Sequence, residues 1–316
     1  MYDLIIIGGG PAAAGASVYA GRSLISTLVL TRDFQGQSTI SPDIRNWIGE
    51  VSISGMDLSE KLEEHVRNQP GLTVKSDEQV KRIDKTADGY QVQSDNDSYT
   101  SRTVIVASGG RRKRLQVPGE EKLEGLGVAY CATCDAPLFE DEDVVVVGAG
   151  NSALETVIDL SGYARKIYVL TRGDRLKGDP VNRKKVEDLS DDRLTLITEA
   201  TVQSIQGQDR VQGLTYYDKK ARDEKSLEVS GVFVAIGSVP NSGLVQKLVD
   251  KNEGGEIIVD HKTGLTSDPN IGAAGDVTDD PFKQNNIAVA GGVRAALSLY
   301  SRLLQMKKYS PCSEPE

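Results

Sequence analysis

The chain contains little cysteine, histidine or tryptophan, and it lacks a long hydrophobic run. Three cysteines, two histidines and one tryptophan occur among its 316 residues. Three cysteines are too few for a framework of structural disulfides. Neither four cysteines nor two cysteines with two histidines occur at the close spacing of a structural zinc site, so we predict no metal. No apolar run approaches the roughly 18 residues that a membrane-spanning helix needs, so we expect no membrane span.

Acidic residues outnumber basic ones, with 46 Asp and Glu against 37 Lys and Arg. The formal net charge of −9 disfavours binding to nucleic acid and to anionic membrane surfaces. Charged residues make up 26% of the chain and hydrophobic residues 38%, which is typical of a soluble globular protein of about two domains. The first seven residues are Ile-rich and have no basic segment before them. This favours a buried first strand over a signal peptide and predicts a cytoplasmic protein.

A glycine-rich segment, GGGPAA at residues 8–13, follows this first strand and opens an alanine-rich helix. In such a segment the first glycine allows a tight turn and the second lets the backbone approach a pyrophosphate. A small third residue lets the helix pack closely on the strand; Gly8, Gly10 and Ala13 hold these positions. A further strand at 27–31 completes a βαβ unit, so the segment predicts a dinucleotide site. The usual acidic ribose ligand after the second strand is missing, since Thr31 and Arg32 stand there.

A second copy of the same signal begins about 140 residues later. The segment GAGNSA at 148–153 follows a valine-rich strand and precedes a helix and the strand 167–170. Either copy alone is a weak signal, because glycine-rich turns are common. The duplication is much more specific and predicts two nucleotide-binding folds.

Between the two copies lies Cys131-Ala132-Thr133-Cys134, followed by Asp135. Two thiols separated by two residues can close a small disulfide ring that exchanges two electrons. A CxxC segment alone is as typical of half a zinc site or of two buried cysteines. The position between two nucleotide folds favours the redox interpretation.

Other segments add detail to this organisation. Alternating short runs between residues 72 and 106 predict an antiparallel β insertion, which ends at small residues from Ala107 onward. The basic run 111–114 is either a solvated linker or a docking patch for an acidic partner. A short strand at 271–277 ends in Gly275-Asp276, and a long helix is predicted from about 284 to 304.

The order GGGPAA, CATCD, GAGNSA and AAGDV resembles the low-molecular-weight thioredoxin reductases, which are FAD-dependent pyridine nucleotide-disulfide oxidoreductases of class II. The resemblance extends from Tyr2 to about Leu304. It implies an α/β fold of two Rossmann-like, three-layer nucleotide-binding domains with antiparallel β insertions. It also implies a discontinuous FAD domain, 1–115 and 246–316, a central domain, 116–245, carrying the CxxC and an NAD(P)-like fold, and a homodimer.

The resemblance also assigns roles to residues. Cys134 would be the thiol near the flavin and Cys131 the one that attacks a partner disulfide. Asp135 would protonate a leaving thiolate, which fits the absence of a nearby histidine in sequence. Lys283 and Gln284 take the place of the family's Arg-Gln pair. The implied FAD-binding residues are Gly8, Gly10, Pro11, Ala12, Ala13, Gln37, Asn46, Val80, Ala107, Gly109, Gly275, Asp276, Lys283 and Gln284.

The chain departs from the family pattern at the second nucleotide site. Members that use NADPH carry a His-Arg-Arg run after the second strand and a further arginine. Here Arg172 alone matches that run, Lys177 replaces the further arginine, and no acidic residue suits NADH either. NADPH, NADH and a donor such as ferredoxin or another carrier therefore remain open. The candidate residues of this site are Gly148, Gly150, Asn151, Ser152, Ala153 and Arg172.

We therefore expect an enzyme that passes two electrons from FAD to the disulfide of Cys131 and Cys134, and on to a thioredoxin-like protein. One alternative is a dithiol oxidase that uses FAD and oxygen. Another is a non-enzymatic flavin-binding redox sensor, which the intact CATCD segment disfavours because a sensor does not need Asp135. If no pyridine nucleotide binds, the basic run 111–114 is favoured as a docking face for an acidic electron carrier. A second flavin in the second nucleotide site is a further alternative. In that case Tyr309 in the tail would cover a flavin face, although a disordered tail is the favoured alternative, and no role is assigned to Cys312.

Overall fold

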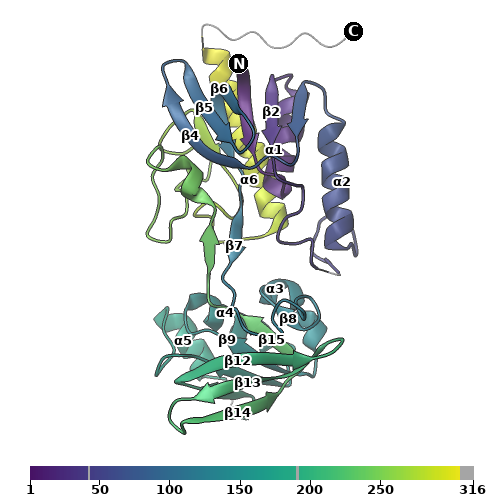
Figure 1. Cartoon of the computed structure of the whole chain (residues 1–316), viewed down its shortest axis with the longest axis vertical. Helices are drawn as coiled ribbons and strands as arrows, with labels where there is room; N and C mark the ends of the chain where they lie inside the picture. Colours follow the sequence, from purple (N-terminus) through teal and green to yellow (C-terminus); the bar gives the residue numbers. More distant parts are fainter. Residues whose placement is uncertain (42, 190–191, 307–316) are drawn as a thin grey trace. The chain divides into compact units, whose positions relative to one another are not determined.

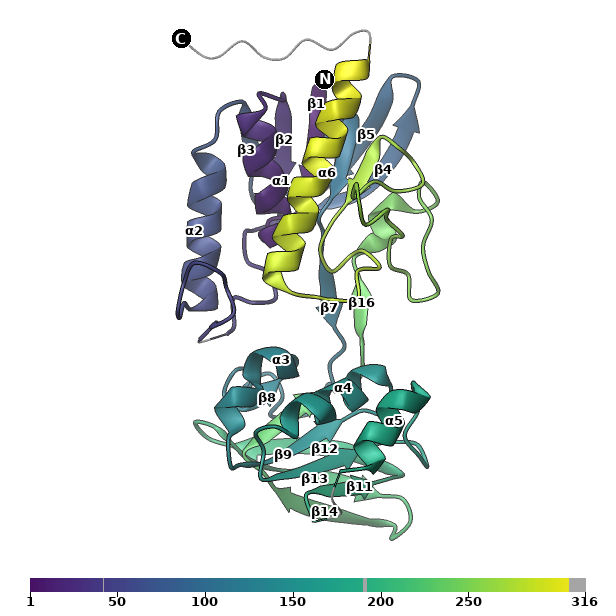
Figure 2. The same ribbon diagram turned by 180° about the vertical axis from the view of Figure 1, so that it is seen from behind.

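The computed structural model describes residues 1–41, 43–189 and 192–306, so the expectations for Tyr309 and Cys312 lie outside the described residues. The chain divides into two compact units. The first unit joins Met1–Arg111 with Val239–Glu316, and the second is Arg112–Ser238. Figures 1 and 2 show the elements of each unit from two opposite sides. The predicted α/β fold class with a discontinuous first domain is confirmed.

The first unit is built on a seven-stranded sheet of order β3-β2-β1-β6-β5-β4, with β17 added on β6. Strands β3, β2, β1, β6 and β17 run parallel, whereas β4 and β5 pair antiparallel. The strands are β1 (Tyr2–Ile7), β2 (Thr27–Leu30), β3 (Leu72–Lys75), β4 (Val80–Thr86), β5 (Gly89–Ser94), β6 (Ser98–Val106) and β17 (Ile271–Ala273).

The sequence predicted an antiparallel β insertion between residues 72 and 106, and this prediction is wrong for the first strand, β3. Strand β3 pairs in parallel with β2. The helix α2 (Gly55–Arg67) lies between these two strands in the chain and acts as the crossover that a parallel pair requires. Only β4 and β5, together with the start of β6, form antiparallel pairs in the described part of this unit's sheet.

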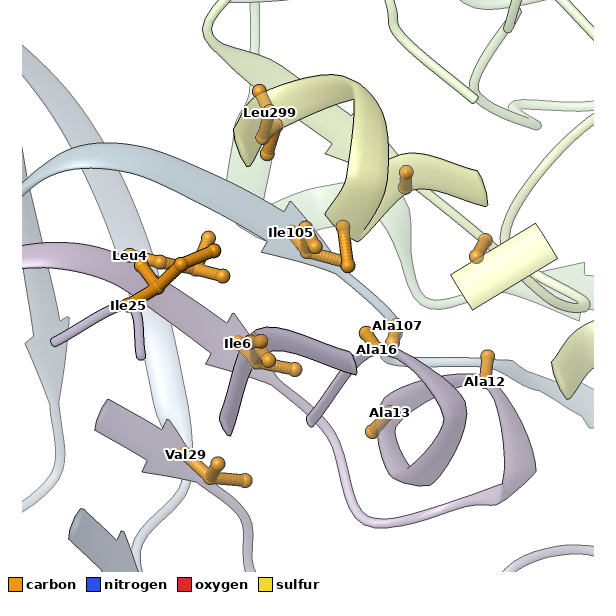
Figure 3. Packing of buried hydrophobic residues seen from close by; sticks show 14 of the residues in the cluster. Leu4, Ile6, Ala12, Ala13, Ala16, Ile25, Val29, Ile105, Ala107 and Leu299 are labelled. Carbon is orange, nitrogen blue, oxygen red and sulfur yellow. The ribbon is translucent and has the colours of Figure 1, made fainter. Parts of the chain in front are cut away.

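Helices α1 (Pro11–Arg22) and α6 (Asn285–Gln305) pack together over this sheet. Small residues permit the close approach, since the core between them is rich in alanine. Figure 3 shows Ala12 and Ala16 of α1, Ile105 of β6 and Leu299 of α6 in this core. A Cβ atom on Gly292 of α6 would lie only 2.0 Å from the Ala12 carbonyl oxygen. The two helix backbones are therefore in near contact at that point.

Helix α6 alone among the described helices is long and apolar enough to cross a membrane by length and composition. The core helix of a folded unit meets the same criterion. Buried residues of α6, among them Ala295 and Leu299, belong to the core that the helix shares with α1. Its apolar character therefore has a packing explanation.

The second unit contains a five-stranded parallel sheet of order β11-β10-β9-β15-β8 and a three-stranded antiparallel sheet, β12-β13-β14. Valines of β9 and Phe233 of β15 form its core with α4 and the segment around Ala132. Strands β7 (Gly110–Arg112) and β16 (Ser238–Pro240) pair where the chain passes between units. The remaining elements of this unit are β8 (Val128–Ala129), α3 (Ala132–Asp135), η1 (Ala136–Phe139), β9 (Asp143–Val147), α4 (Asn151–Leu160), β10 (Lys166–Leu170), α5 (Pro180–Glu187), β11 (Leu194–Ile197), β12 (Ala200–Gly207), β13 (Val211–Asp218), β14 (Asp223–Glu228) and β15 (Gly231–Val234). The short helix η2 (Ser242–Val245) belongs to the first unit.

Adding one methyl group at adjacent positions of α6 should have opposite effects on stability. Gly292→Ala forces α6 away from α1, and we expect it to lower the free energy of unfolding by about 1–3 kcal/mol. Gly291→Ala places its Cβ 3.4 Å from the Ala274 Cβ, an ordinary contact. It should therefore gain helix propensity, by up to about 1 kcal/mol. Urea unfolding followed by circular dichroism measures both; equal effects would contradict the close α1–α6 contact.

Candidate functional site

The first glycine-rich turn lies against the end of β6. Gly8 has a φ of 131°, and a Cβ there would lie 2.2 Å from the Ala107 carbonyl oxygen, so only glycine fits. The Ala107 amide in turn donates to the Ile7 carbonyl at 2.9 Å. Gly10 borders open space, and α1 has no side-chain cap at its N-terminus. Free amides at an open helix N-terminus suit a pyrophosphate, so this cradle fits a dinucleotide.

Two pairs of residues far apart in sequence meet beside this turn. The Gln37 side-chain amide donates to the Asp276 carboxylate at 2.8 Å. The Asn46 amide donates to the Gln284 side-chain oxygen at 3.3 Å. The structure thus brings together four residues that the family resemblance had implied separately. Gly275, Asp276 and Gln284 also line one pocket at the start of α6.

Sequence reasoning missed the residues that attach the segment around Gln37 and Asn46 to helix α6. The Ser38 hydroxyl donates to the Asn285 side-chain oxygen at 3.0 Å, and the Asn286 amide donates to the Asn46 carbonyl at 2.7 Å. Two adjacent asparagines at a helix start were a signal, because asparagine is disfavoured inside helices and favoured where its side chain can bond nearby groups. They attach Ser38 and Asn46 to the N-terminus of α6.

The remaining residues that the resemblance implied for FAD binding have different settings. Gly109 and Gly275 have positive φ values of 64° and 78°, and Val80 begins β4 with its side chain half-buried against the sheet core. The Lys283 ammonium pairs with Glu256 at 2.9 Å and also contacts the Thr278 carbonyl. That lysine is therefore held by residues of its own unit.

The end of β2 has no acidic group free for a ribose among the described residues. Thr31 is buried, and its hydroxyl donates to the Asp33 carbonyl. The Asp33 carboxylate accepts from Arg32 at 2.9 Å and from the Gln35 amide at 3.0 Å. The neighbouring groups thus already use the carboxylate nearest to this strand end.

Cys131 and Cys134 form a disulfide with their Cα atoms 5.3 Å apart. Cys131 directly precedes the short helix α3 as its N-cap residue, and its carbonyl accepts from the Asp135 amide at 3.0 Å. Cys134 is exposed and Cys131 is half-buried. Both cysteines are therefore at least partly accessible, as a pair that exchanges with a second disulfide has to be.

Asp135 follows the disulfide directly. Burial raises the pKa of its carboxyl group from 3.8 to about 6, because the charged form loses hydration, and the positive charge of Arg112 opposes this rise. A carboxyl group with such a pKa can both give and take a proton near neutral pH.

The second glycine-rich turn repeats the geometry of the first. Gly148 has a φ of 155°, and a Cβ there would lie 2.3 Å from the Ala235 carbonyl oxygen at the end of β15. Gly150 borders open space at the N-terminus of α4, which also lacks a side-chain cap. Ser152 is exposed in the first turn of α4 and Ala153 is buried against the strand. The backbone therefore keeps the shape of a pyrophosphate cradle.

The loop after β10 closes onto this second turn. The Lys177 amide donates to the Ala149 carbonyl at 2.7 Å, and the Asn151 side-chain oxygen accepts from the Asp179 amide at 2.7 Å. Thr171 is buried, and its hydroxyl accepts from the Gly173 amide at 3.2 Å. Arg172 is exposed on this loop, and Arg175 and Lys177 are also accessible to solvent.

The basic run does not form one free patch. The Arg114 guanidinium pairs with Glu124 at 2.6 Å and lies 5.9 Å from the Tyr130 ring centre. Arg112 acts electrostatically on Asp135. At least these two cations therefore have partners within their own unit.

Comparison with known proteins gives a consistent result. The family described as pyridine nucleotide-disulphide oxidoreductase matches residues 2–292. An "NADH dehydrogenase" of Bacillus subtilis is 39% identical over 305 residues, and a subunit of the alkyl hydroperoxide reductase of Staphylococcus aureus is 35% identical over 305 residues. Each match covers 96% of this chain and 59% of the relative, so the chain spans about three fifths of the length of these relatives.

Solved structures resemble the whole chain. A thioredoxin reductase from Streptococcus pyogenes has a TM-score of 0.90 at 34% identity, and the match covers 97% of this chain and 99% of that one. A thioredoxin reductase from Giardia duodenalis has a TM-score of 0.89 at 28% identity, with 96% and 99% covered. The two Rossmann-like units are therefore those of the thioredoxin reductase fold.

Asp135→Asn should stabilise the protein at high pH only. The folded state holds the Asp135 proton up to a pH of about 6, whereas the unfolded state releases it near pH 3.8. The carboxylate thus lowers stability as pH rises through this window, by an amount on the order of 1–3 kcal/mol above it. The neutral asparagine avoids this loss, so the melting temperature of the variant should exceed that of the parent at pH 8 and match it at pH 4.

Asp218→Asn provides a control of opposite sign. The Lys225 ammonium and backbone amides lower the pKa of Asp218 to about 2, so its charged form favours the folded state. This variant should melt at a lower temperature than the parent at pH 8. If Asp135→Asn behaves in the same way, the burial of the Asp135 carboxyl group is not the dominant effect.

Proposed function

The chain belongs to the pyridine nucleotide-disulphide oxidoreductases, and within that family we propose that it reduces the disulfide of a thioredoxin-like protein. It is an FAD-binding flavoprotein oxidoreductase with the thioredoxin reductase fold. Bound FAD supplies the two-electron carrier of such an enzyme. One observation carries the proposal: a partly exposed disulfide of Cys131 and Cys134 lies directly before a carboxyl group whose pKa is raised to about 6.

The proposed reaction has three balanced steps at these residues. The Cys131–Cys134 disulfide takes up two electrons, which bound FAD would supply, and two protons and becomes two thiols. The Cys131 thiol gives its proton to the Asp135 carboxylate and attacks one sulfur of the partner disulfide, and Asp135 returns the proton to the departing partner sulfur. The Cys134 thiol finally attacks the Cys131 sulfur of the mixed disulfide and its proton passes to the second partner sulfur, which leaves as a thiol and restores the internal disulfide.

We propose that the first turn binds FAD. Gly8, Gly10 and the first turn of α1, from Pro11 to Ala13, would hold the pyrophosphate, because this helix end is open and carries no side-chain cap. Asp276 and Gln37 would bind hydroxyl groups of the cofactor chain, since both are polar and already adjacent. Asn46 and Gln284, which bond each other, would lie farther along the same side of the cofactor chain.

We also propose that the second turn binds a nicotinamide nucleotide and that NADPH is preferred over NADH. The support is the loop after β10, which carries the accessible cations Arg172, Arg175 and Lys177. Its two carboxylates are Asp174 and Asp179, and the Asp179 side chain is already used as the N-cap of α5. Backbone hydrogen bonds hold this loop on the Gly148 turn, so the cations would lie near a ribose 2′-phosphate. A donor other than a nicotinamide nucleotide, such as ferredoxin, is the competing possibility.

The partner would be a thioredoxin-like protein disulfide, since the similar solved structures are named thioredoxin reductases. The homodimer is inferred from the resemblance to thioredoxin reductases alone, and the cytoplasmic location stays a prediction made from the sequence.

Anaerobic titration tests the donor. NADPH should bleach the oxidised flavin of the purified protein. Arg172→Ala should raise the KM for NADPH by about tenfold, because a charge-assisted contact to phosphate is worth about 1.5 kcal/mol or more. The KM for NADH serves as the internal control and should stay unchanged. Bleaching by reduced ferredoxin but by neither nucleotide would contradict the proposed donor.

Removing one thiol tests the disulfide relay. Cys134→Ser should abolish reduction of a thioredoxin disulfide while NADPH still bleaches the flavin, since the internal disulfide can no longer form. The same change at the third cysteine, Cys312→Ser, is the matched control and should keep full activity. Undiminished thioredoxin reduction by Cys134→Ser would rule out the proposed relay.

A further inference from the structure

The loop that carries the two cysteines is attached to α4 by a side-chain hydrogen bond. The Thr133 hydroxyl, on the residue between Ala132 and Cys134, donates to the Asp159 carboxylate at 2.9 Å. Asp159 lies in the last turn of α4, at the far end from the Gly148 turn. Both residues belong to the second unit, so the contact lies within one compact body.

The rest of this loop has few other attachments. Helix α3 is a single turn, and Cys131 at its start makes no side-chain cap. Ala132 is buried in the same core cluster as Val157 and Leu160 of α4, which holds one side of the turn. Thr133 itself is exposed. The hydrogen bond to Asp159 is therefore the polar attachment of the residue that directly precedes Cys134.

Opening of the disulfide has to move this loop. Two bonded sulfurs are about 2 Å apart, whereas two thiols separate to van der Waals contact, so the residues between them must shift when the bond breaks. A hydrogen bond formed on the closed loop favours the closed form.

We propose that Asp159 is a positioning residue that, through Thr133, holds the Cys131–Cys134 loop in its disulfide form and makes the pair a stronger reductant. The inference deepens the proposed function, because it assumes that this pair is the redox-active one. The half-reaction is the uptake of two electrons and two protons by the disulfide to give two thiols. Asp159 and Thr133 take no part in that exchange and only shift its equilibrium.

Redox equilibration of the full-length holoenzyme tests the proposal. The protein is equilibrated with mixtures of reduced and oxidised dithiothreitol, and the dithiol fraction of Cys131 and Cys134 is read by alkylation and mass spectrometry. Thr133→Val removes the donor of the hydrogen bond, and Asp159→Asn replaces its charged acceptor by a neutral one. Each should shift the equilibrium about fivefold to tenfold toward the dithiol, which at tenfold is about 30 mV. Thr133→Ser keeps the hydroxyl and should restore the parent value.

A double variant and a charge control separate this role from general effects. Thr133→Val combined with Asp159→Asn should shift the equilibrium no further than the larger single change, because one interaction is lost in both. Glu155→Gln removes the same charge from the exposed face of α4, one turn away, and should leave the equilibrium unchanged. An equal shift in Glu155→Gln, or additive shifts in the double variant, would overturn the proposal.

The readout also distinguishes this inference from the proposed function. Dithiothreitol replaces both the donor and the partner, so the equilibrium is measured even if the proposed donor or partner is wrong. A purely structural role would lower the melting temperature of oxidised and reduced protein equally and leave the thiol–disulfide equilibrium unchanged. That result would overturn the positioning role, while loss of thioredoxin reduction in Cys134→Ser would still support the relay.

Discussion

The close approach of two backbones at a glycine determines the geometry of both halves of this protein. Gly8 at the end of β1 lies against the Ala107 carbonyl, and Gly148 at the end of β9 lies against the Ala235 carbonyl. A Cβ at either glycine would overlap that carbonyl, so the turn, the following helix and the neighbouring strand end are fixed together. Each unit therefore presents an open helix N-terminus beside a strand end, and the functional side chains are placed relative to that arrangement.

The redox pair depends on the second of these turns through α4. The N-terminus of α4 borders the nucleotide cradle, its middle packs in one cluster with Ala132, and its last turn carries Asp159 beside Thr133. One helix thus supports both the cradle and the cysteine loop within a single unit. The burial that fixes this loop also covers Asp135, which is why its carboxyl group has a raised pKa without any neighbouring negative charge among the causes.

Patterns that are local in sequence predicted much of this molecule. The fold class followed from two strand–glycine–helix signals, and that prediction is confirmed. The CxxC spacing suggested a ring that the structure closes as a disulfide. Such patterns could not predict contacts between residues that are far apart in the sequence. Nothing local indicates that Gln37 bonds Asp276, because that pairing depends on where α6 returns to the sheet. The parallel pairing of β3 was missed for the same reason, since short alternating strands fit either direction.

The two cradles share a backbone design, so their ligands must be distinguished by the residues just after the second strand of each unit. After β2 the nearest carboxylate, Asp33, is paired with Arg32, and the loop presents little free charge. After β10 the loop bonds back onto the glycine turn and leaves Arg172, Arg175 and Lys177 accessible. A neutral strand end tolerates a ribose without a 2′-phosphate, whereas a cationic one attracts that phosphate. In the proposed assignment the duplicated turn therefore sets where a dinucleotide would bind, and the side chains at the end of the second strand would decide which one it is.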